Sequence, residues 1–222
     1  MLINRSLKNK KVLITCGPTW IPIDEVRVIS NVSTGQLGHL LTIALQKQGA
    51  RVTVLEGPVT QFFLAPRKIK IIKYHYFQEL LTLLKKELEK HFDIIIHAAA
   101  VSDYKLKKTY RSKLNSKLDE LKLHLIPTIK IINRIKQWAP NSILVGFKLE
   151  PTLRNRHLSI TASELFKKAH CDLVVANSLR NNHYHGYIIN NEKQILANGA
   201  SRRGIVKSLV KILSDGLKEN RT

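Results

Sequence analysis

The residues best suited to chemistry in this sequence gather where buried strands are expected to end. Apolar runs give way to small or polar residues at four places, Gly17-Pro18-Thr19, Ala98–Tyr104, Gly146-Phe147-Lys148 and Ala176-Asn177-Ser178. In doubly wound α/β folds, ligands bind beyond the carboxyl ends of the strands. Each segment alone would be an ordinary turn, but four of them in one sheet predict a ligand site at this edge.

The segment at 30–38, which reads S-N-V-S-T-G-Q-L-G, leads into an expected helix and could bind phosphate. Ser33 or Thr34 could cap that helix. Gly35 and Gly38 would let a ligand approach backbone N–H groups at the positive end of the helix dipole. The segment matches neither G-x-G-x-x-G nor the Walker pattern. A plain helix cap with packing glycines explains these residues equally well.

Charged side chains close to these strand ends are further candidates. Asp103 is a carboxylate directly after a strand, and the lysines of 105–117 could fold over bound phosphates. Tyr104 and Lys108 satisfy Y-x-x-x-K, a pattern of short-chain dehydrogenases. That pair follows the strand directly here and the glycine fingerprint is missing, so we interpret the match as coincidence.

Hydrophobic periodicity places these residues on strands that alternate with helices. It predicts strands at 11–16, 51–55, 68–73, 93–97, 121–126, 142–147 and 172–176, a hairpin over 187–196, and helices at 35–49, 77–90, 127–138, 161–169 and 201–217. Residues 18–34 and 104–117 lack periodicity and are expected to be loops. We therefore predict a Rossmann-like, doubly wound, mostly parallel sheet with helices on both faces and a small flap and hairpin region. Residues 1–222 would form one domain, with the lysine-rich loop at 105–118 as a mobile flap.

Composition excludes several classes of protein. Hydrophobic residues make up 44% of the 222, which is enough for a buried core, yet no apolar run is long enough to span a bilayer. The basic N-terminus lacks the long apolar region of a secretory signal, so a cytoplasmic protein is expected. Cys16 and Cys171 are too few for a disulfide framework and are expected to be reduced, and His183 and His185 have no carboxylate spaced to complete a metal site.

The formal net charge of +21 is extreme and raises nucleic acid or an anionic membrane as partners. The basic residues are scattered from end to end, without an aromatic-interleaved basic block or a basic amphipathic helix. A solvated basic surface, or a site for polyanionic small molecules, explains such scattering better. Nucleic acid and membrane binding are therefore not expected.

Five blocks of sequence are informative in combination. They are Gly17-Pro18-Thr19 with P-I-D-E-V-R at 22–27 and S-N-V-S-T-G at 30–35, G-A-R-V-T at 49–53 with E-G-P-V at 56–59, A-A-A-V-S-D-Y at 98–104, V-G-F-K at 145–148 and D-L-V-V-A-N at 172–177. Over nearly the whole chain they resemble the phosphopantothenate–cysteine ligases. The combination of P-I-D-x-V-R-x-I-S-N-x-S-x-G with A-A-A-V-x-D-Y makes the resemblance specific.

This resemblance implies an enzyme of coenzyme A biosynthesis that joins 4′-phosphopantothenate to L-cysteine. A nucleoside triphosphate, CTP or ATP, would activate the carboxylate as an acyl-nucleotide with release of pyrophosphate, and the cysteine amine would then attack. Mg²⁺ would be bound mainly through the nucleotide phosphates, and the enzyme would be a homodimer. The chain has no room for the flavin-dependent decarboxylase domain fused to many relatives, which implies the free-standing form.

The resemblance also implies roles for individual residues. Asn31, Arg27 and Lys113 are the expected catalytic residues. Asn31 would bind phosphopantothenate and the acyl-nucleotide and could donate to an oxyanion, Arg27 would grip phosphate, and Lys113 would belong to the flap that covers the phosphates. Nucleotide contacts are expected from Gly17, Ser33, Gly35, Gly38, Ala98, Ala99, Ala100, Asp103, Lys113, Phe147, Lys168 and Asn177.

The chain departs from the family pattern at a few positions. Asn115 and Ser116 stand in the flap where lysines are usual, Glu164 stands where many members have lysine, and Trp20-Ile21 replaces a more usual charged residue. These departures leave the choice between CTP and ATP open. Two rival functions stay open as well. One is a Rossmann-type NAD(P)-dependent reductase, for which Glu56 would be the ribose-binding acid although the glycine fingerprint is missing, and the other is a basic nucleic-acid-binding protein.

Overall fold

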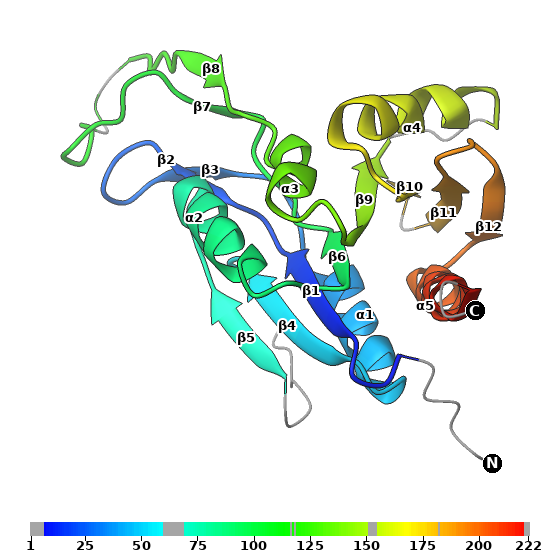
Figure 1. Ribbon diagram of the computed structural model, residues 1–222. Coiled ribbons are helices and arrows are strands. Elements are labelled where there is room, and N and C mark those ends of the chain that lie inside the picture. Colours follow the sequence, from blue (N-terminus) through cyan, green and yellow to red (C-terminus); the bar gives the residue numbers. More distant parts are fainter. Residues whose placement is uncertain are drawn as a thin grey trace.

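The computed structural model describes residues 7–59, 69–115, 117, 119–150, 155–181 and 183–219. An eight-stranded sheet in the order β12-β11-β10-β9-β6-β1-β4-β5 forms its centre (Figure 1). The strands are β1 (Lys11–Cys16), β4 (Arg51–Glu56), β5 (Lys70–Lys73), β6 (Ile94–His97), β9 (Ile143–Leu149), β10 (Leu173–Arg180), β11 (His183–Asn190) and β12 (Ile195–Gly199). Six of these strands pair in parallel, in the spatial order β10-β9-β6-β1-β4-β5. Strands β11 and β12 complete the sheet in antiparallel pairs.

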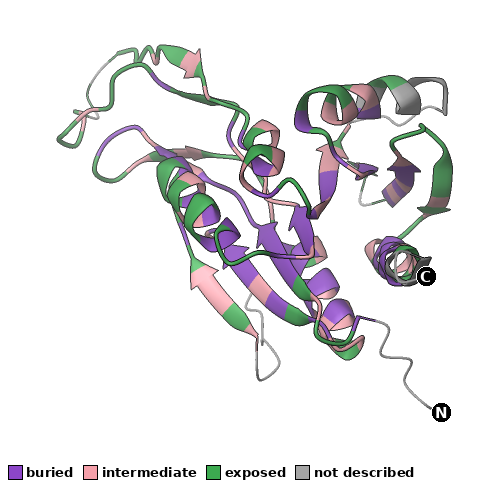
Figure 2. Cartoon of the chain, in the orientation of Figure 1, coloured by how far each residue is buried: buried purple, intermediate pink, exposed green. Residues whose placement is uncertain are grey.

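Helices cover both faces of this sheet. They are α1 (Gln36–Lys47), α2 (Phe77–Leu88), α3 (Ile132–Trp138), α4 (Asn155–Ala169) and α5 (Arg202–Glu219). Helices α2, α3 and α4 pack on one face and α1 and α5 on the other. Successive residues of a strand point to opposite faces, so Leu13 of β1 belongs to the first core while Val12 and Ile14 belong to the second. Burial of β1 on both faces (Figure 2) explains why its sequence reads as a continuous apolar run. The predicted fold class is confirmed.

Two small antiparallel ribbons extend from the carboxyl edge of the sheet (Figure 1). Strand β2 (Trp20–Pro22) pairs with β3 (Val28–Ser30), and β7 (Tyr104–Leu106) pairs with β8 (Leu125–Pro127). The prediction that 18–34 and 104–117 contain no strand was therefore wrong. Each ribbon strand has only three residues, too few for a periodic pattern to be read from the sequence.

Several boundaries also differ from the prediction. Helix α4 begins at Asn155, six residues before the expected start at 161, and β10 ends at Arg180, four residues after the expected end at 176. The strand expected over 121–126 is confined to β8, and the helix expected from Pro127 begins at Ile132 instead. Proline suits the first turn of a helix, but it suits an edge strand as well, and here Pro127 pairs with Tyr104. The hairpin turn expected at 191–193 is confirmed, although β11 begins four residues earlier than predicted. No helix of the described residues is long and apolar enough to cross a membrane.

Candidate functional site

The principal pocket lies beyond the carboxyl ends of β1, β6, β9 and β10 and encloses about 690 Å³. Ten of the residues expected from the sequence line it, namely Asn31, Ser33, Gly35, Gly38, Ala98, Ala99, Ala100, Asp103, Phe147 and Asn177. They come from segments far apart in the sequence that meet because parallel strands end at one edge. Four other expected residues, Gly17, Arg27, Lys113 and Lys168, are not among the residues that line this pocket.

Helix α1 begins at the pocket with a glycine. Gly35 is its N-cap, with a left-handed φ of 70°, and no side-chain cap hydrogen bond is present. The cap expected from Ser33 or Thr34 is thus absent. Thr34 Oγ1 makes only a long contact of 3.4 Å with the Gln36 N–H. Uncapped N–H groups at a helix start are suited to bind an anion.

Gly38 and Gly17 serve close packing of the backbone. A Cβ on Gly38 would lie 2.3 Å from Cys16 Cβ, so only glycine allows α1 to approach β1 this closely. Gly17 has a left-handed φ of 79°, and a Cβ there would lie 2.9 Å from Val59 Cγ1. The packing explanation, which the sequence left open, therefore holds for Gly38, although this residue also lines the pocket.

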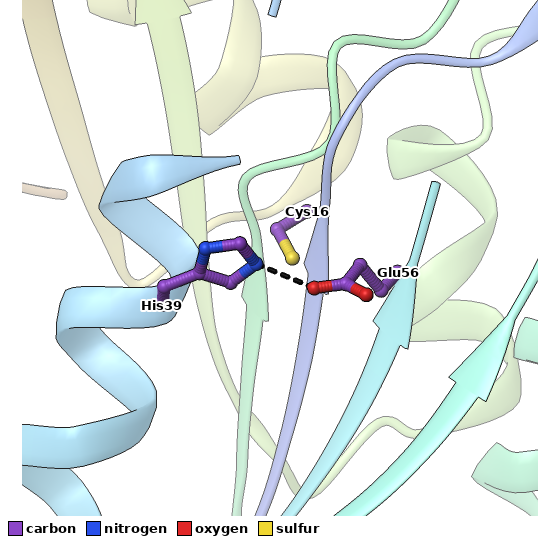
Figure 3. Close-up of side chains that lie close together, drawn as sticks. All are labelled: Cys16, His39 and Glu56. Atoms are coloured by element: carbon purple, nitrogen blue, oxygen red, sulfur yellow. Dashed lines mark hydrogen bonds and ion pairs between the residues drawn. The ribbon is translucent and has the colours of Figure 1, made fainter. Parts of the chain in front are cut away.

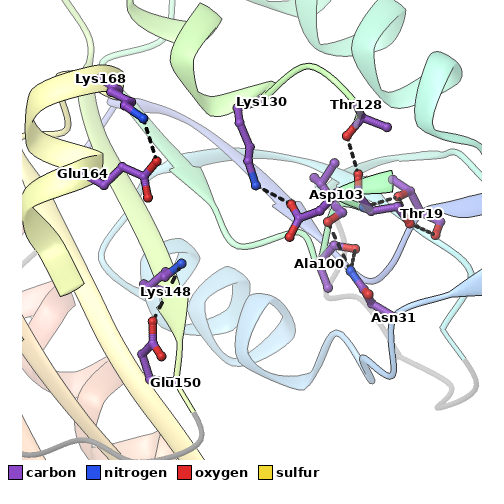
Figure 4. A network of polar contacts seen from close by, with 12 residues as sticks. Thr19, Asn31, Ala100, Asp103, Thr128, Lys130, Lys148, Glu150, Glu164 and Lys168 are labelled. Carbon is purple, nitrogen blue, oxygen red and sulfur yellow. Dashed lines mark hydrogen bonds and ion pairs between the residues drawn. The ribbon is translucent and has the colours of Figure 1, made fainter. Parts of the chain in front are cut away.

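Asn31 connects the segment before α1 to the end of β6. Its Nδ2 donates hydrogen bonds to the backbone carbonyls of Ala100, at 3.2 Å, and Val101, at 3.1 Å (Figure 4). These two carbonyls fix the amide orientation, because a flipped amide would bring Oδ1 against two acceptors. The amide side chain is therefore positioned by the strand-end backbone that lines the pocket.

A polar network continues from Asn31 toward α3. The Ser102 N–H donates to Thr19 Oγ1 at 2.9 Å, and Thr128 Oγ1 donates to the Ser102 carbonyl at 2.7 Å. Asp103 accepts a hydrogen bond from Lys130 Nζ at 2.6 Å (Figure 4). Lys130 and Thr128 both line the pocket, and neither was predicted from the sequence. Their approach depends on the β7–β8 pairing, which leaves no signal in the local sequence.

Two further ion pairs lie around the pocket (Figure 4). Lys168 contacts Glu164 at 3.0 Å on α4, and Lys148 contacts Glu150 at 3.7 Å at the end of β9. The nearby ammonium of Lys168 lowers the pKa of Glu164 below its ordinary value. Glu164, the residue that departs from the family pattern, lines the pocket, whereas Lys168 does not.

Arg27 and Lys113 lie near the β2–β3 ribbon. The Arg27 guanidinium contacts Asp24 at 3.5 Å and donates to the Leu114 carbonyl at 3.2 Å. Leu114 directly follows the exposed Lys113. The structure thus brings Arg27 to the segment that carries Lys113, and away from the pocket lining.

A cluster of buried polar groups lies beside Cys16, which lines the pocket (Figure 3). His39 Nε2 is hydrogen-bonded to Glu56, which also pairs with Lys73, and the Cys16 thiol lies beside them. Cys16, His39 and Glu56 are close enough to hold a metal ion, but Glu56 already has two partners. Burial, reinforced by Glu56, raises the pKa of the Cys16 thiol, so thiolate ligation is disfavoured.

Burial also controls the other titratable groups around the sheet. His97, at the end of β6, contacts Thr15 Oγ1 at 2.9 Å, and burial lowers its pKa to about 4. The imidazole therefore stays neutral at the pocket floor. Both cysteines are free, as predicted, and both are buried. Burial raises the pKa of Cys171 to about 12.

The sequence matches the family model of the DNA/pantothenate metabolism flavoprotein C-terminal domain over residues 7–209. The chain belongs to this family. It is 36% identical over 177 residues to the coenzyme A biosynthesis bifunctional protein CoaBC of Thermococcus kodakarensis, covering 79% of this chain and 43% of that protein. It is 35% identical over 215 residues to the CoaBC protein of Borreliella burgdorferi, covering 93% of this chain and 53% of that protein. The chain spans about half the length of these curated relatives.

Solved structures agree with the family assignment. The DNA/pantothenate metabolism flavoprotein from Streptococcus pneumoniae superposes with a TM-score of 0.83 at 25% identity, over 93% of this chain and 99% of that one. A C-terminal domain of a CoaBC protein superposes with a TM-score of 0.80 at 21% identity, over 97% and 99%, which supports the fold. Each superposition covers 99% of the solved chain, so the fold of this chain corresponds to nearly the whole of those two chains.

Proposed function

We propose that this chain is a phosphopantothenate–cysteine ligase of coenzyme A biosynthesis. The observation that carries the proposal is that Asn31, the uncapped start of α1 at Gly35, and Asp103 meet in one pocket of a chain that belongs to this family. Its relatives from Thermococcus and Borreliella are named for coenzyme A biosynthesis. We further propose that the enzyme works as a homodimer, as the sequence resemblance implies, and that it is cytoplasmic, in keeping with an enzyme of coenzyme A biosynthesis.

The reaction would proceed in two steps. The carboxylate of 4′-phosphopantothenate attacks the α-phosphorus of CTP or ATP, an acyl–phosphate bond forms, and pyrophosphate leaves. The cysteine amine then attacks the acyl carbon, an amide bond forms, and the nucleoside monophosphate leaves while the amine loses a proton. Both steps place negative charge near the pocket floor, which suits the uncapped N–H groups at the start of α1.

Asn31 is the proposed oxyanion donor. Both Nδ2 hydrogens are engaged by the Ala100 and Val101 carbonyls in the structure, at 3.1 to 3.2 Å and exposed to solvent. A developing oxyanion can take over one of these hydrogens, because a charged acceptor forms the stronger hydrogen bond. Asn31 would then keep its position through the second carbonyl.

Mg²⁺ fits this pocket as an ion held by the nucleotide. The two carboxylates that line the described pocket, Asp103 and Glu164, are each paired with a lysine, so neither is set aside for a metal. When bound, the ion would neutralise phosphate charge and polarise the phosphoryl oxygens.

Neither rival function is favoured by the site. Glu56, which a reductase would need for ribose, is 1% exposed and engaged by His39 and Lys73. It is also absent from the lining of the pocket. The scattered basic residues form no recognised nucleic-acid-binding module, and the family match over residues 7–209 accounts for the five sequence blocks without one.

The deciding experiment mixes the protein with 4′-phosphopantothenate, cysteine, Mg²⁺ and either CTP or ATP and follows pyrophosphate release. We expect one pyrophosphate and one nucleoside monophosphate for each amide formed, and the faster nucleotide identifies the natural one. Orthophosphate with a nucleoside diphosphate would mean acyl-phosphate chemistry and would contradict the acyl-nucleotide mechanism.

A further inference from the structure

A side hollow of about 280 Å³ opens between the starts of α1 and α5. Its lining comprises Gln36, Leu40, His183, Tyr184, Ala200, Ser201, Arg202 and Arg203. Three of these residues, Gln36, Tyr184 and Arg202, also line the principal pocket. The hollow is therefore a side arm of the principal pocket, next to the start of α1 at Gly35 and Gln36.

The side arm is basic. Arg202, Arg203 and His183 line it, and none of its lining residues is acidic. The first turn of α5 likewise contains no acidic residue, although two arginines occupy it. Cations at the start of a helix face the positive end of the dipole, which is unfavourable unless an anion is nearby.

Arg202 differs from the other cations of the pocket. Lys130 pairs with Asp103 and Lys148 pairs with Glu150. Within the described part of the chain, no carboxylate lies within ion-pair distance of Arg202. Its guanidinium carbon instead lies 5.1 Å from the centre of the Tyr184 ring, which supports the side chain while leaving its N–H groups available.

We propose that Arg202 binds the terminal phosphates of the nucleoside triphosphate, and the pyrophosphate that leaves, in this side arm. A planar guanidinium matches phosphate oxygens in a bidentate manner, and the shared Gln36 places the start of α1 on the same ligand. The inference rests on the proposed function for the identity of the ligand. The phosphate of 4′-phosphopantothenate has the same chemistry, and the experiment below separates the two sources.

The test is calorimetric titration of the intact chain with inorganic pyrophosphate, with CTP or ATP, and with 4′-phosphopantothenate. Arg202→Gln removes the positive charge at this half-buried position. Arg202→Lys keeps the charge but cannot bind a phosphate through two parallel N–H groups. Lys211→Gln, an exposed position on the same helix, is the matched control for net charge. Thermal unfolding of each variant checks that it is folded.

We expect Arg202→Gln to weaken binding of pyrophosphate and nucleotide about tenfold or more, the scale of one lost charge-assisted hydrogen bond. The affinity of Arg202→Lys for pyrophosphate and nucleotide should lie between those of the wild type and Arg202→Gln. The affinity for 4′-phosphopantothenate should not change in either variant. Unchanged pyrophosphate binding, an equal loss in Lys211→Gln, or a loss confined to phosphopantothenate would each overturn the assignment. Because binding is measured without turnover, an inactive wild-type protein would contradict the ligase proposal while leaving Arg202 testable.

Discussion

Arg27 donates a hydrogen bond from its guanidinium to the backbone carbonyl of Leu114 at 3.2 Å, across 87 residues of sequence. The same loop is fastened by Asp24, whose Oδ2 accepts the Leu114 N–H at 3.0 Å. The other oxygen of Asp24 accepts the N–H groups of Val26 and Arg27. These bonds, led by the one from Leu114, lower the pKa of Asp24. Asp24 and Arg27 thus anchor the segment directly after Lys113.

Asp24→Ala should release this anchored segment. The side chain of Asp24 is fully buried, and its loss leaves the Leu114, Val26 and Arg27 N–H groups without their acceptor. We expect trypsin to cleave after Arg111 and Lys113 several-fold faster than in the wild type, followed by mass spectrometry of the fragments. Asp119→Ala, an exposed position nearby, is the control. Equal cleavage rates in both variants would show that the Asp24 hydrogen bonds do not restrain the segment.

Asn31→Asp should lower turnover by roughly 10²-fold or more, the scale of losing one oxyanion donor. The structure adds a second reason, because a carboxylate would face the Ala100 and Val101 carbonyls that now accept from Nδ2. The pyrophosphate assay measures the loss, and Asn141→Asp at an exposed position is the control. Near-normal turnover of a folded Asn31→Asp enzyme would remove Asn31 from the mechanism.

The sequence was sufficient to predict the parts of the site that follow from strand ends. The apolar stretches of β6, β9 and β10 are buried on both faces, so they mark these strands in the sequence, and the parallel topology then brings their carboxyl ends together. The strand-end residues Asp103, Phe147 and Asn177 were located in this way. Their roles toward the nucleotide remain predictions.

The parts that were missed depend on pairings between distant short segments. Nothing local indicates that Tyr104 pairs with Pro127, and this pairing brings Lys130 to Asp103. Likewise, no sequence pattern predicts that the start of α5 lies beside the start of α1. The only local indication that Arg202 could bind an anion is that two arginines occupy the first turn of α5. The i,i+4 pair of Glu164 and Lys168 was readable in principle, because that spacing puts both on one helix face.

His97 should make stability depend on pH. Burial lowers its pKa in the folded protein to about 4, whereas an unfolded histidine has a pKa near 6.5. Between these values only the unfolded chain binds the proton, so the free energy of unfolding should fall as pH falls, by about 3 kcal/mol in total. Above about pH 6.5 His97 is neutral in both the folded and the unfolded protein, so it causes no further change in the free energy of unfolding.

Urea unfolding between pH 4 and 7.5 measures this dependence. His97→Gln removes the titrating group, so its slope over this window should be flatter than that of the wild type, whatever its absolute stability. His124→Gln is the matched control at an exposed histidine. A wild-type slope that persists in His97→Gln would assign the pH dependence to other groups.

Lys113→Ala should lower kcat more than it raises KM for the nucleotide. Lys113 is exposed and does not line the pocket in the structure, so its contact with the phosphates requires the flap to close. Closure would bring the ammonium to the phosphates as charge shifts onto the leaving pyrophosphate, which is an interaction made in the transition state. We expect kcat to fall about tenfold or more, as for one lost charge-assisted contact.

The neighbouring lysines provide the internal comparison for Lys113. Lys105 lies in β7 and the Lys107 N–H is bonded to the His124 carbonyl, so the β7–β8 ribbon holds the backbone of this part of the flap. Alanine at Lys105, Lys107 or Lys108 should therefore change kcat about twofold or less, since an exposed side chain makes little specific contact. Equal small losses at all four positions would show that the flap supplies only a diffuse positive field. A loss confined to Lys113 would instead identify the residue next to the Arg27–Leu114 anchor as the one that reaches the phosphates.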